Sequence, residues 1–212
     1  MESFEIRVCK SCGLRYPILA ERARGTRCPI CMGETRVAHK GNLFRERTPT
    51  LASSSVAATR EINLAVLLDN IRSAWNVGSI LRSAEGFGFA RAYLCGITPT
   101  PESDAVQKTS LGAEDSVSWS YHKDAVKLVK GLKKEGWKVF GLEENEKALS
   151  INEKKKIKND AVLIVGNEIA GVDPGLLKLC DQVLFIPMRG EKKSFNVAVA
   201  FGIAAQALTA SS

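Results

Sequence analysis

Apolar residues occur in short runs along the last three quarters of the chain, and these runs follow two patterns. Runs of about four to eight residues rich in Val, Ile and Leu predict buried strands, whereas an apolar residue at every third or fourth position predicts a helix. The predicted strands cover residues 62–68, 92–95, 117–121, 137–142, 161–165 and 182–186, and the predicted helices cover residues 77–87, 103–110, 125–135, 174–179 and 196–210. This alternation predicts an α/β fold with a parallel sheet covered on both faces, which binds ligands beyond the carboxyl ends of its strands.

Residues 41–60 follow neither pattern. Ser, Thr and Ala dominate this segment and Pro49 interrupts it, as is typical of a linker. We therefore expect a small domain at residues 1–40, a linker at 41–60 and a larger domain at 61–212. No apolar run reaches the roughly 18 to 20 residues of a membrane span, and the N-terminus lacks the apolar core of a signal peptide. We expect a cytoplasmic protein with no membrane partner.

The N-terminal segment contains two Cys-x-x-Cys pairs. Cys9 and Cys12 form the first pair, Cys28 and Cys31 form the second, and 15 residues separate the pairs. Each pair presents two thiolates, and four thiolates suit a tetrahedral zinc ion. Two disulfides are disfavoured without an export signal, and a redox site would need one pair inside a βαβ unit. The spacing predicts a structural zinc ion, which a segment of about 40 residues needs for stability.

The positive charge is concentrated near the N-terminus. Residues 1–60 hold 11 Lys and Arg against 5 acidic residues, a balance of +6, while residues 61–212 hold 19 against 18, a balance of +1. Nine of the 11 cations are arginines, whose planar guanidinium suits phosphates and base edges. Four of them lie between the cysteine pairs: Arg15, Arg22, Arg24 and Arg27. A merely solvated basic surface is the alternative, but the location favours a polyanionic partner.

Polar residues and glycines also follow three of the predicted strands. At the end of the first of these strands lie Asp69 and Asn70, and Asn76, Gly78 and Arg82 follow them. Asn76 and Arg82 would point about 120 degrees apart on a helix. Both can address one ligand only if one of them lies at the helix entrance, with Asn76 as the N-cap. A capped helix with a solvated arginine is the structural alternative.

The second of these strands, at residues 161–165, is followed by residues 166–168, which read Gly-Asn-Glu, and then by Gly171. Gly166 would let a ligand approach the backbone, and Glu168 adds a carboxylate near the strand end. Asp173, which precedes a proline, is predicted to cap the next helix.

The third of these strands, at residues 182–186, runs into Ile-Pro-Met at residues 186–188. A charged loop then leads to residues 194–197, which read Ser-Phe-Asn-Val. Ser194 and Asn196 stand at the start of a helix of small apolar residues and are candidates to cap it. The chain contains neither a dinucleotide-binding glycine motif nor a P-loop, so neither of these phosphate sites is expected.

Together these segments resemble the SPOUT superfamily of RNA methyltransferases, specifically its SpoU/TrmH branch of ribose 2′-O-methyltransferases. The resemblance covers about residues 61–212 and includes the family's three motifs in order, at residues 76–82, 166–171 and 186–197. The third motif of the family usually reads Ser-Leu-Asn-Val-Ser. Here Phe195 replaces the Leu and keeps an apolar wall, whereas Ala198 replaces the last Ser and makes the helix entrance less polar.

The resemblance implies a deep trefoil knot in the C-terminal third, a homodimer, and S-adenosylmethionine bound inside the knot. It implies that the cofactor contacts Leu142, Gly166, Asn167, Glu168, Ile186, Met188, Ser194, Phe195 and Asn196. It implies that the catalytic residues are Asn76, Arg82, Glu168, Ser194 and Asn196. The family assigns the base to the matching arginine, but a guanidinium pKa above about 12 makes deprotonation difficult. We therefore expect Arg82 to hold a phosphate and to stabilise the developing alkoxide, and we assign no residue as the base that takes the proton.

The predicted function is that of an S-adenosylmethionine-dependent RNA 2′-O-methyltransferase acting on tRNA or rRNA, with the zinc-binding segment selecting the RNA. The alternative is a catalytically silent RNA-binding or ribosome-assembly factor that keeps the fold. The presence of the catalytic residues favours the enzyme. A base methyltransferase of the same superfamily is less favoured, because the Ser-x-Asn pattern belongs to the ribose branch.

Overall fold

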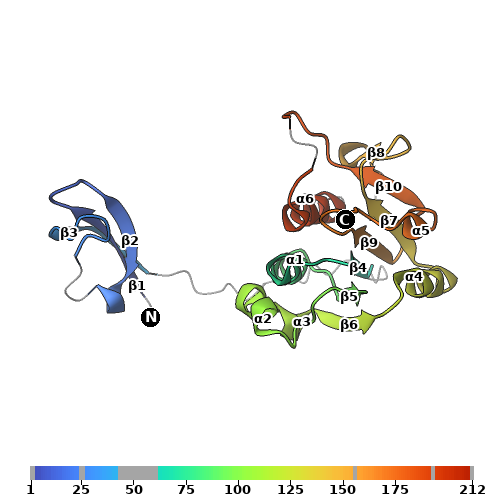
Figure 1. Ribbon diagram of the computed structural model, residues 1–212, viewed down its shortest axis with the longest axis horizontal. Helices are drawn as coiled ribbons and strands as arrows, with labels where there is room; N and C mark the ends of the chain where they lie inside the picture. Colours follow the sequence, from blue (N-terminus) through green and yellow to red (C-terminus); the bar gives the residue numbers. More distant parts are fainter. Residues whose placement is uncertain (1–2, 24–26, 43–61, 155–156, 192–193, 211–212) are drawn as a thin grey trace, which may run out of the picture. The chain divides into compact units, whose positions relative to one another are not determined.

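The computed structural model describes residues 3–23, 27–42, 62–154, 157–191 and 194–210. The chain divides into two compact units, Met1–Thr59 and Arg60–Ser212 (Figure 1). We call them unit 1 and unit 2.

Unit 1 is a small antiparallel sheet in the order β2-β1-β3. Its elements are β1 Ser3–Cys9, β2 Arg15–Leu19, the short 3-10 helix η1 Ala20–Arg22, and β3 Thr35–Asn42. Strand β3 continues through residues 41 and 42, which we had expected to begin the linker, and the rest of that segment lies outside the described residues.

Unit 2 is built on a seven-stranded sheet in the order β6-β5-β4-β9-β7-β10-β8. The strands are β4 Leu64–Asp69, β5 Arg91–Cys95, β6 Ser118–His122, β7 Lys138–Leu142, β8 Leu149–Ser150, β9 Ala161–Val165 and β10 Gln182–Phe185. All of their pairings are parallel, as the sequence predicted. The carboxyl ends of the strands therefore meet at one edge, where ligands bind in such sheets.

Helices cover both faces of this sheet (Figure 1). They are α1 Ala74–Gly86, α2 Asp104–Ser110, α3 Ala113–Ser116, α4 Ala125–Lys134, the 3-10 helix η2 Ile151–Glu153, α5 Pro174–Leu177 and α6 Val197–Thr209. None of the helices in the described ranges is both long and apolar enough to cross a membrane.

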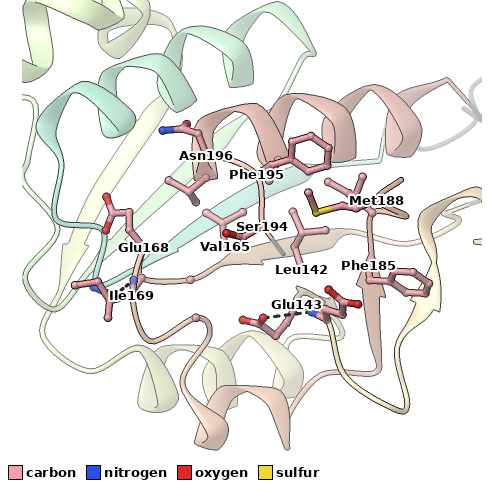
Figure 2. Close-up of a pocket in the computed structure, with 17 residues that line it drawn as sticks. Leu142, Glu143, Val165, Glu168, Ile169, Phe185, Met188, Ser194, Phe195 and Asn196 are labelled. Carbon is pink, nitrogen blue, oxygen red and sulfur yellow. Dashed lines mark hydrogen bonds between the residues drawn. The ribbon is translucent and has the colours of Figure 1, made fainter. Parts of the chain in front are cut away.

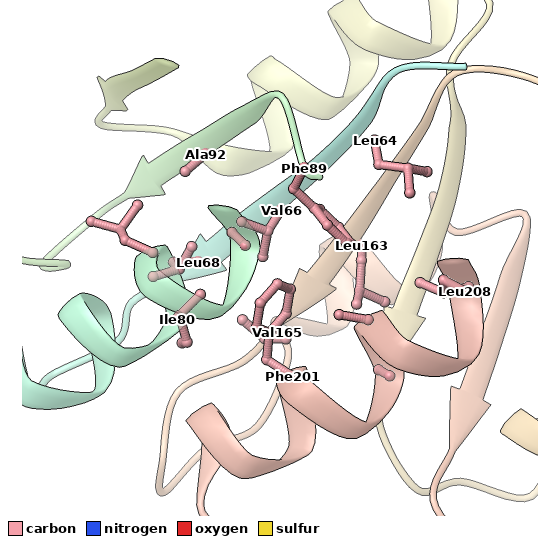
Figure 3. Packing of buried hydrophobic residues seen from close by; sticks show 14 of the residues in the cluster. Leu64, Val66, Leu68, Ile80, Phe89, Ala92, Leu163, Val165, Phe201 and Leu208 are labelled. Atoms are coloured by element: carbon pink, nitrogen blue, oxygen red, sulfur yellow. The ribbon is translucent and has the colours of Figure 1, made fainter. Parts of the chain in front are cut away.

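The core is split into two layers because β4 and β9 are buried on both faces. On one face, Phe201 of α6 packs edge-on against Phe89, with 5.3 Å between the ring centres, as part of the cluster in Figure 3. On the other face, Leu67 and Ile164 pack with Val129 of α4. Burying one such large side chain stabilises a fold by about 1.5 to 3 kcal/mol, so these layers hold the strand ends in place.

Two helix starts follow the sequence prediction and one does not. Asn196 caps α6, and Asp173 caps α5 with a proline in the first turn. Helix α1, however, begins three residues earlier than predicted, because the Ser73 hydroxyl accepts a hydrogen bond from the Asn76 N–H at 3.4 Å. The prediction that Asn76 is the N-cap is therefore wrong. Serine caps a helix as well as asparagine does, which leaves the Asn76 side chain free to contact other groups.

Candidate active site at the carboxyl ends of the strands

A cavity of about 470 Å³ lies at the carboxyl ends of β7, β9 and β10 (Figure 2). The start of α6 and the loop after β9 contribute two of its walls. Its lining includes every residue predicted to contact a cofactor, namely Leu142, Gly166, Asn167, Glu168, Ile186, Met188, Ser194, Phe195 and Asn196. The second and third motifs contribute residues to this lining, whereas Asn76 and Arg82 of the first motif do not.

The loop after β9 folds back tightly on itself at Gly166. Asn167 and Gly171 exchange backbone hydrogen bonds, at 3.0 and 2.9 Å. A Cβ atom on Gly166 would overlap the backbone of Gly171 and Val172. The position therefore requires glycine because two stretches of backbone approach closely there.

Glu168 projects from this loop to the start of α1. Its carboxylate accepts hydrogen bonds from the backbone N–H groups of Arg72 and Ser73, at 2.9 and 3.1 Å, and from the Asn76 side-chain amide, at 3.0 Å. Partial burial raises the pKa of Glu168, but these donors outweigh burial and leave the pKa below its ordinary value. The carboxylate is therefore ionised at neutral pH, its lowered pKa makes it a weak base, and its hydrogen bonds position the start of α1.

Asn76 also forms a hydrogen bond with Asn196 of the third motif. Its side-chain oxygen accepts a hydrogen bond from the Asn196 amide at 3.0 Å, and the Asn196 oxygen in turn accepts from the Ala198 N–H at 2.9 Å. The chain Glu168–Asn76–Asn196 thus joins all three motifs. Ser194 also lines the cavity, and its hydroxyl has no hydrogen-bond partner among the described residues.

Two residues of the first motif lie outside this chain of hydrogen bonds. Arg82 is exposed on α1, and in the described part of the molecule its guanidinium forms no ion pair or hydrogen bond. Gly78 is buried where α1 packs against α2, and a Cβ there would overlap Thr109 and the Val106 carbonyl. Gly78 is therefore a packing residue, and the cavity does not include Arg82.

Two carboxylates hold the loop after β9; the sequence interpretation missed Glu143 and gave Asp69 no role beyond ending a strand. Glu143, directly after β7, lines the cavity and accepts from the Val172 N–H at 2.9 Å. Asp69 is 2% exposed and accepts from the Asp173 N–H at 2.9 Å, while burial raises its pKa. Glu143 directly follows a predicted strand, so the rule that ligands bind at the carboxyl ends of strands could have identified it.

The four cysteines of unit 1 form a second candidate site. Their sulfur atoms all lie within 4.8 Å of one another, with 3.5 Å between Cys9 and Cys31 and 3.5 Å between Cys12 and Cys28. The Cys12 N–H donates to the Cys9 sulfur and, with other donors, lowers the pKa of Cys9 to about 6. A thiolate set of this size fits a tetrahedral ion with metal–sulfur bonds of about 2.3 Å.

A parallel sheet with a cavity at its carboxyl edge defines unit 2 as a ligand-binding α/β protein. Comparison with known proteins identifies the family to which it belongs. The family model described as "SpoU rRNA Methylase family" matches residues 63–206, which is more than half of the chain. The chain belongs to this family, as its motifs predicted.

The named relatives agree with this family. The chain is 32% identical over 162 residues to the tRNA (guanosine(18)-2′-O)-methyltransferase of Thermus thermophilus, covering 76% of this chain and 82% of that protein. It is 29% identical over 142 residues to the 23S rRNA (guanosine-2′-O-)-methyltransferase RlmB of Xanthomonas axonopodis pv. citri, covering 66% of this chain and 55% of that protein.

A solved structure agrees as well. The TrmH/SpoU tRNA modifying enzyme of A. aeolicus superposes with a TM-score of 0.65 at 25% identity, covering 72% of this chain and 76% of that one. The prediction of a SpoU/TrmH RNA 2′-O-methyltransferase is confirmed at the level of the family. A catalytically silent binding factor is not favoured.

Proposed function

We propose that this protein transfers a methyl group from S-adenosylmethionine to a ribose 2′-hydroxyl in tRNA or rRNA. The observation that carries the proposal is the hydrogen-bonded chain Glu168–Asn76–Asn196, which brings three distant motifs together beside one cavity. Membership of a methylase family and two relatives named as ribose methyltransferases of tRNA and rRNA support it.

The cavity suits the cofactor in shape and charge. Its apolar walls include Leu142, Phe185 and Met188, which fit an adenosine ring, and the carboxylates of Glu143 and Glu168 attract a cationic ligand. When bound, S-adenosylmethionine supplies a methyl group that is already a strong electrophile. Residues of the lining would enclose it, and the close approach of Gly166 to the backbone of Gly171 and Val172 would hold the loop after β9 as one wall of the cavity.

The protein's own residues then position the ribose. Ser194 and Asn196 lie at the cavity edge where the reacting hydroxyl would enter, and Glu168 holds the start of α1 against them through Asn76. Arg82, exposed on the same helix, would bind the phosphate next to that ribose and stabilise the alkoxide as its proton leaves. Correct alignment of this kind supplies much of the rate of a group transfer.

Mapping of 2′-O-methyl groups in total RNA from cells with and without this gene tests the proposal directly. We expect one position, or a few, in tRNA or rRNA to lose the methyl group when the gene is absent. Purified protein should restore it with S-adenosylmethionine. An unchanged methylation map, together with no methyl transfer by the purified protein, would contradict the proposal.

We also propose that unit 2 contains the family's trefoil knot and forms a homodimer. Strand β10 pairs with β7, and the chain then returns to place α6 beside α1, which is compatible with a knotted crossing. Apolar side chains remain exposed on these two helices, including Trp75, Val199 and Ile203. A second copy of the chain would cover them.

Unit 1, in our proposal, is a zinc ribbon that ends with β3 at residue 42, joined by a linker at 43–60 to the methyltransferase domain at 61–212. Cys9, Cys12, Cys28 and Cys31 would hold the ion as thiolates, a state that a reducing compartment such as the cytoplasm maintains. The ion would stabilise a sheet too small to have a large core of its own.

Removal of the zinc ligand Cys28 should therefore unfold unit 1 alone. We expect Cys28→Ser to abolish zinc binding and the structure of unit 1, because a three-thiolate site loses most of the metal affinity on which folding depends. Metal analysis and the circular dichroism of the full chain would measure this. Cys180→Ser in unit 2 is the control and should keep its zinc. Equal zinc contents in the two variants would contradict the assignment.

The basic ribbon would select the RNA. We expect deletion of residues 1–45 to raise the KM for the RNA about tenfold or more, equivalent to the loss of at least 1.4 kcal/mol of binding. The affinity for S-adenosylmethionine should not change, because all described residues of the cavity belong to unit 2. An unchanged KM on the natural RNA would show that unit 1 does not select it.

A further inference from the structure

The two cysteine turns of unit 1 are built alike but differ at one position. In each turn, the residue after the second cysteine has a left-handed backbone, with φ of 75° at Gly13 and 59° at Met32. Each also donates a backbone hydrogen bond to the carbonyl of the first cysteine in its turn. Glycine adopts this conformation without a steric cost, whereas a methionine brings its Cβ close to a carbonyl oxygen. The second turn therefore tolerates strain that the first avoids.

Packing does not explain the methionine. Its side chain is 66% exposed, and Ile30 at the tip of the same turn is 74% exposed. In the first turn the residue equivalent to Ile30 is Ser11, which is polar. Backbone strain beneath a pair of exposed apolar side chains is characteristic of a contact surface rather than of a core.

The charges around this turn indicate what it contacts. Arg27, directly before the turn, and Arg15 on β2 are both exposed, and the first 60 residues carry the balance of +6. Exposed arginines attract phosphates. An RNA strand presents apolar base faces between its phosphates only where the bases are unpaired, since a duplex buries these faces.

We propose that Ile30 and Met32 form a contact surface for unpaired RNA bases, which we call the knuckle surface, while the neighbouring arginines bind the phosphates. The inference rests on the proposed RNA substrate and adds how unit 1 would recognise it. The knuckle surface would favour loops and unpaired ends over helical RNA.

The test uses the full chain and a short fluorescein-labelled RNA of mixed sequence, offered as a single strand and as a duplex. Fluorescence anisotropy measures both affinities. We expect Met32→Gly and Ile30→Ser to weaken binding of the single strand about three- to tenfold and to leave binding of the duplex unchanged, because only apolar base contacts are lost. Met32→Gly relieves the backbone strain, so its zinc content should remain that of the wild type.

Val37→Ser is the matched control, because Val37 is an apolar residue of the same unit, 37% exposed on β3. It should bind both RNAs as the wild type does. Unchanged single-strand binding in both knuckle variants would overturn the inference, as would equal weakening in the control. Methyl transfer by the wild type would in that case leave the proposed function standing. Conversely, a wild type that transfers no methyl group, but binds single strands through Ile30 and Met32, would overturn the proposed function alone.

Discussion

Replacement of Arg82 with alanine is expected to abolish methyl transfer while the affinity for S-adenosylmethionine stays near that of the wild type. The guanidinium is exposed on α1 and does not line the cavity, so its loss removes no cofactor contact. It would remove the group that binds the phosphate and stabilises the developing alkoxide, an effect worth about 10²- to 10³-fold in kcat for a single donor. Transfer of a labelled methyl group and calorimetric titration with the cofactor measure the two quantities separately.

Arg91→Ala provides the control for this variant. Arg91 is also exposed in unit 2, but it lies at the first residue of β5, the strand end opposite to the cavity edge. It should keep full activity. Arg82→Lys should recover only part of the rate, since an ammonium group cannot form the paired contacts of a guanidinium with a phosphate. Loss of cofactor binding in Arg82→Ala would refute the assigned role.

Much of this site could be predicted from the sequence because glycine and polar residues stand where a buried strand ends. Gly166 follows a predicted strand and Asn196 begins a predicted helix, so the apolar pattern along the chain locates both residues without knowledge of their contacts. The segments that begin at these two residues line one cavity, because parallel strands end at a common edge of the sheet. The family motifs then added the chemistry that periodicity does not contain.

The rest depended on contacts between residues distant in sequence. The hydrogen bond between Asn76 and Asn196 joins residues 120 positions apart, and the bond of Glu143 to Val172 joins residues 29 apart. Neither pattern along the chain predicts such pairs. The cap of α1 was misplaced for a related reason. Ser73 and Asn76 are both good caps, and only the bonds of Asn76 to Glu168 and Asn196 show that its side chain has other partners.

Short elements were missed because their patterns are too brief to recognise. Strand β8 has two residues and α3 has four, so each spans about one apolar period and neither repeats it. They nevertheless matter little for the site, since β8 pairs only at the sheet edge beside β10, and α3 lies next to β6 at the other end of the sheet.

Replacement of Gly166 with alanine should eliminate cofactor binding without unfolding unit 2. The added methyl group would overlap the backbone of Gly171 and Val172, so the loop after β9 must move outward. This displacement would withdraw Glu168 from Ser73 and Asn76 and deform one wall of the cavity. We expect at least a 100-fold loss of affinity for S-adenosylmethionine, measured by calorimetry, against a stability cost of about 1 to 3 kcal/mol for overpacking.

A second glycine shows whether this effect belongs to the site. Gly131 lies in α4, and a Cβ there would meet no atom within 4 Å. Gly131→Ala should therefore keep the cofactor affinity and raise the unfolding free energy by up to about 1 kcal/mol, because alanine is the better helix former. If Gly166→Ala bound the cofactor as tightly as Gly131→Ala, the loop after β9 could not be a rigid wall of the site. The hydrogen bonds of Glu168 would then have a purely structural role in fastening the loop to α1.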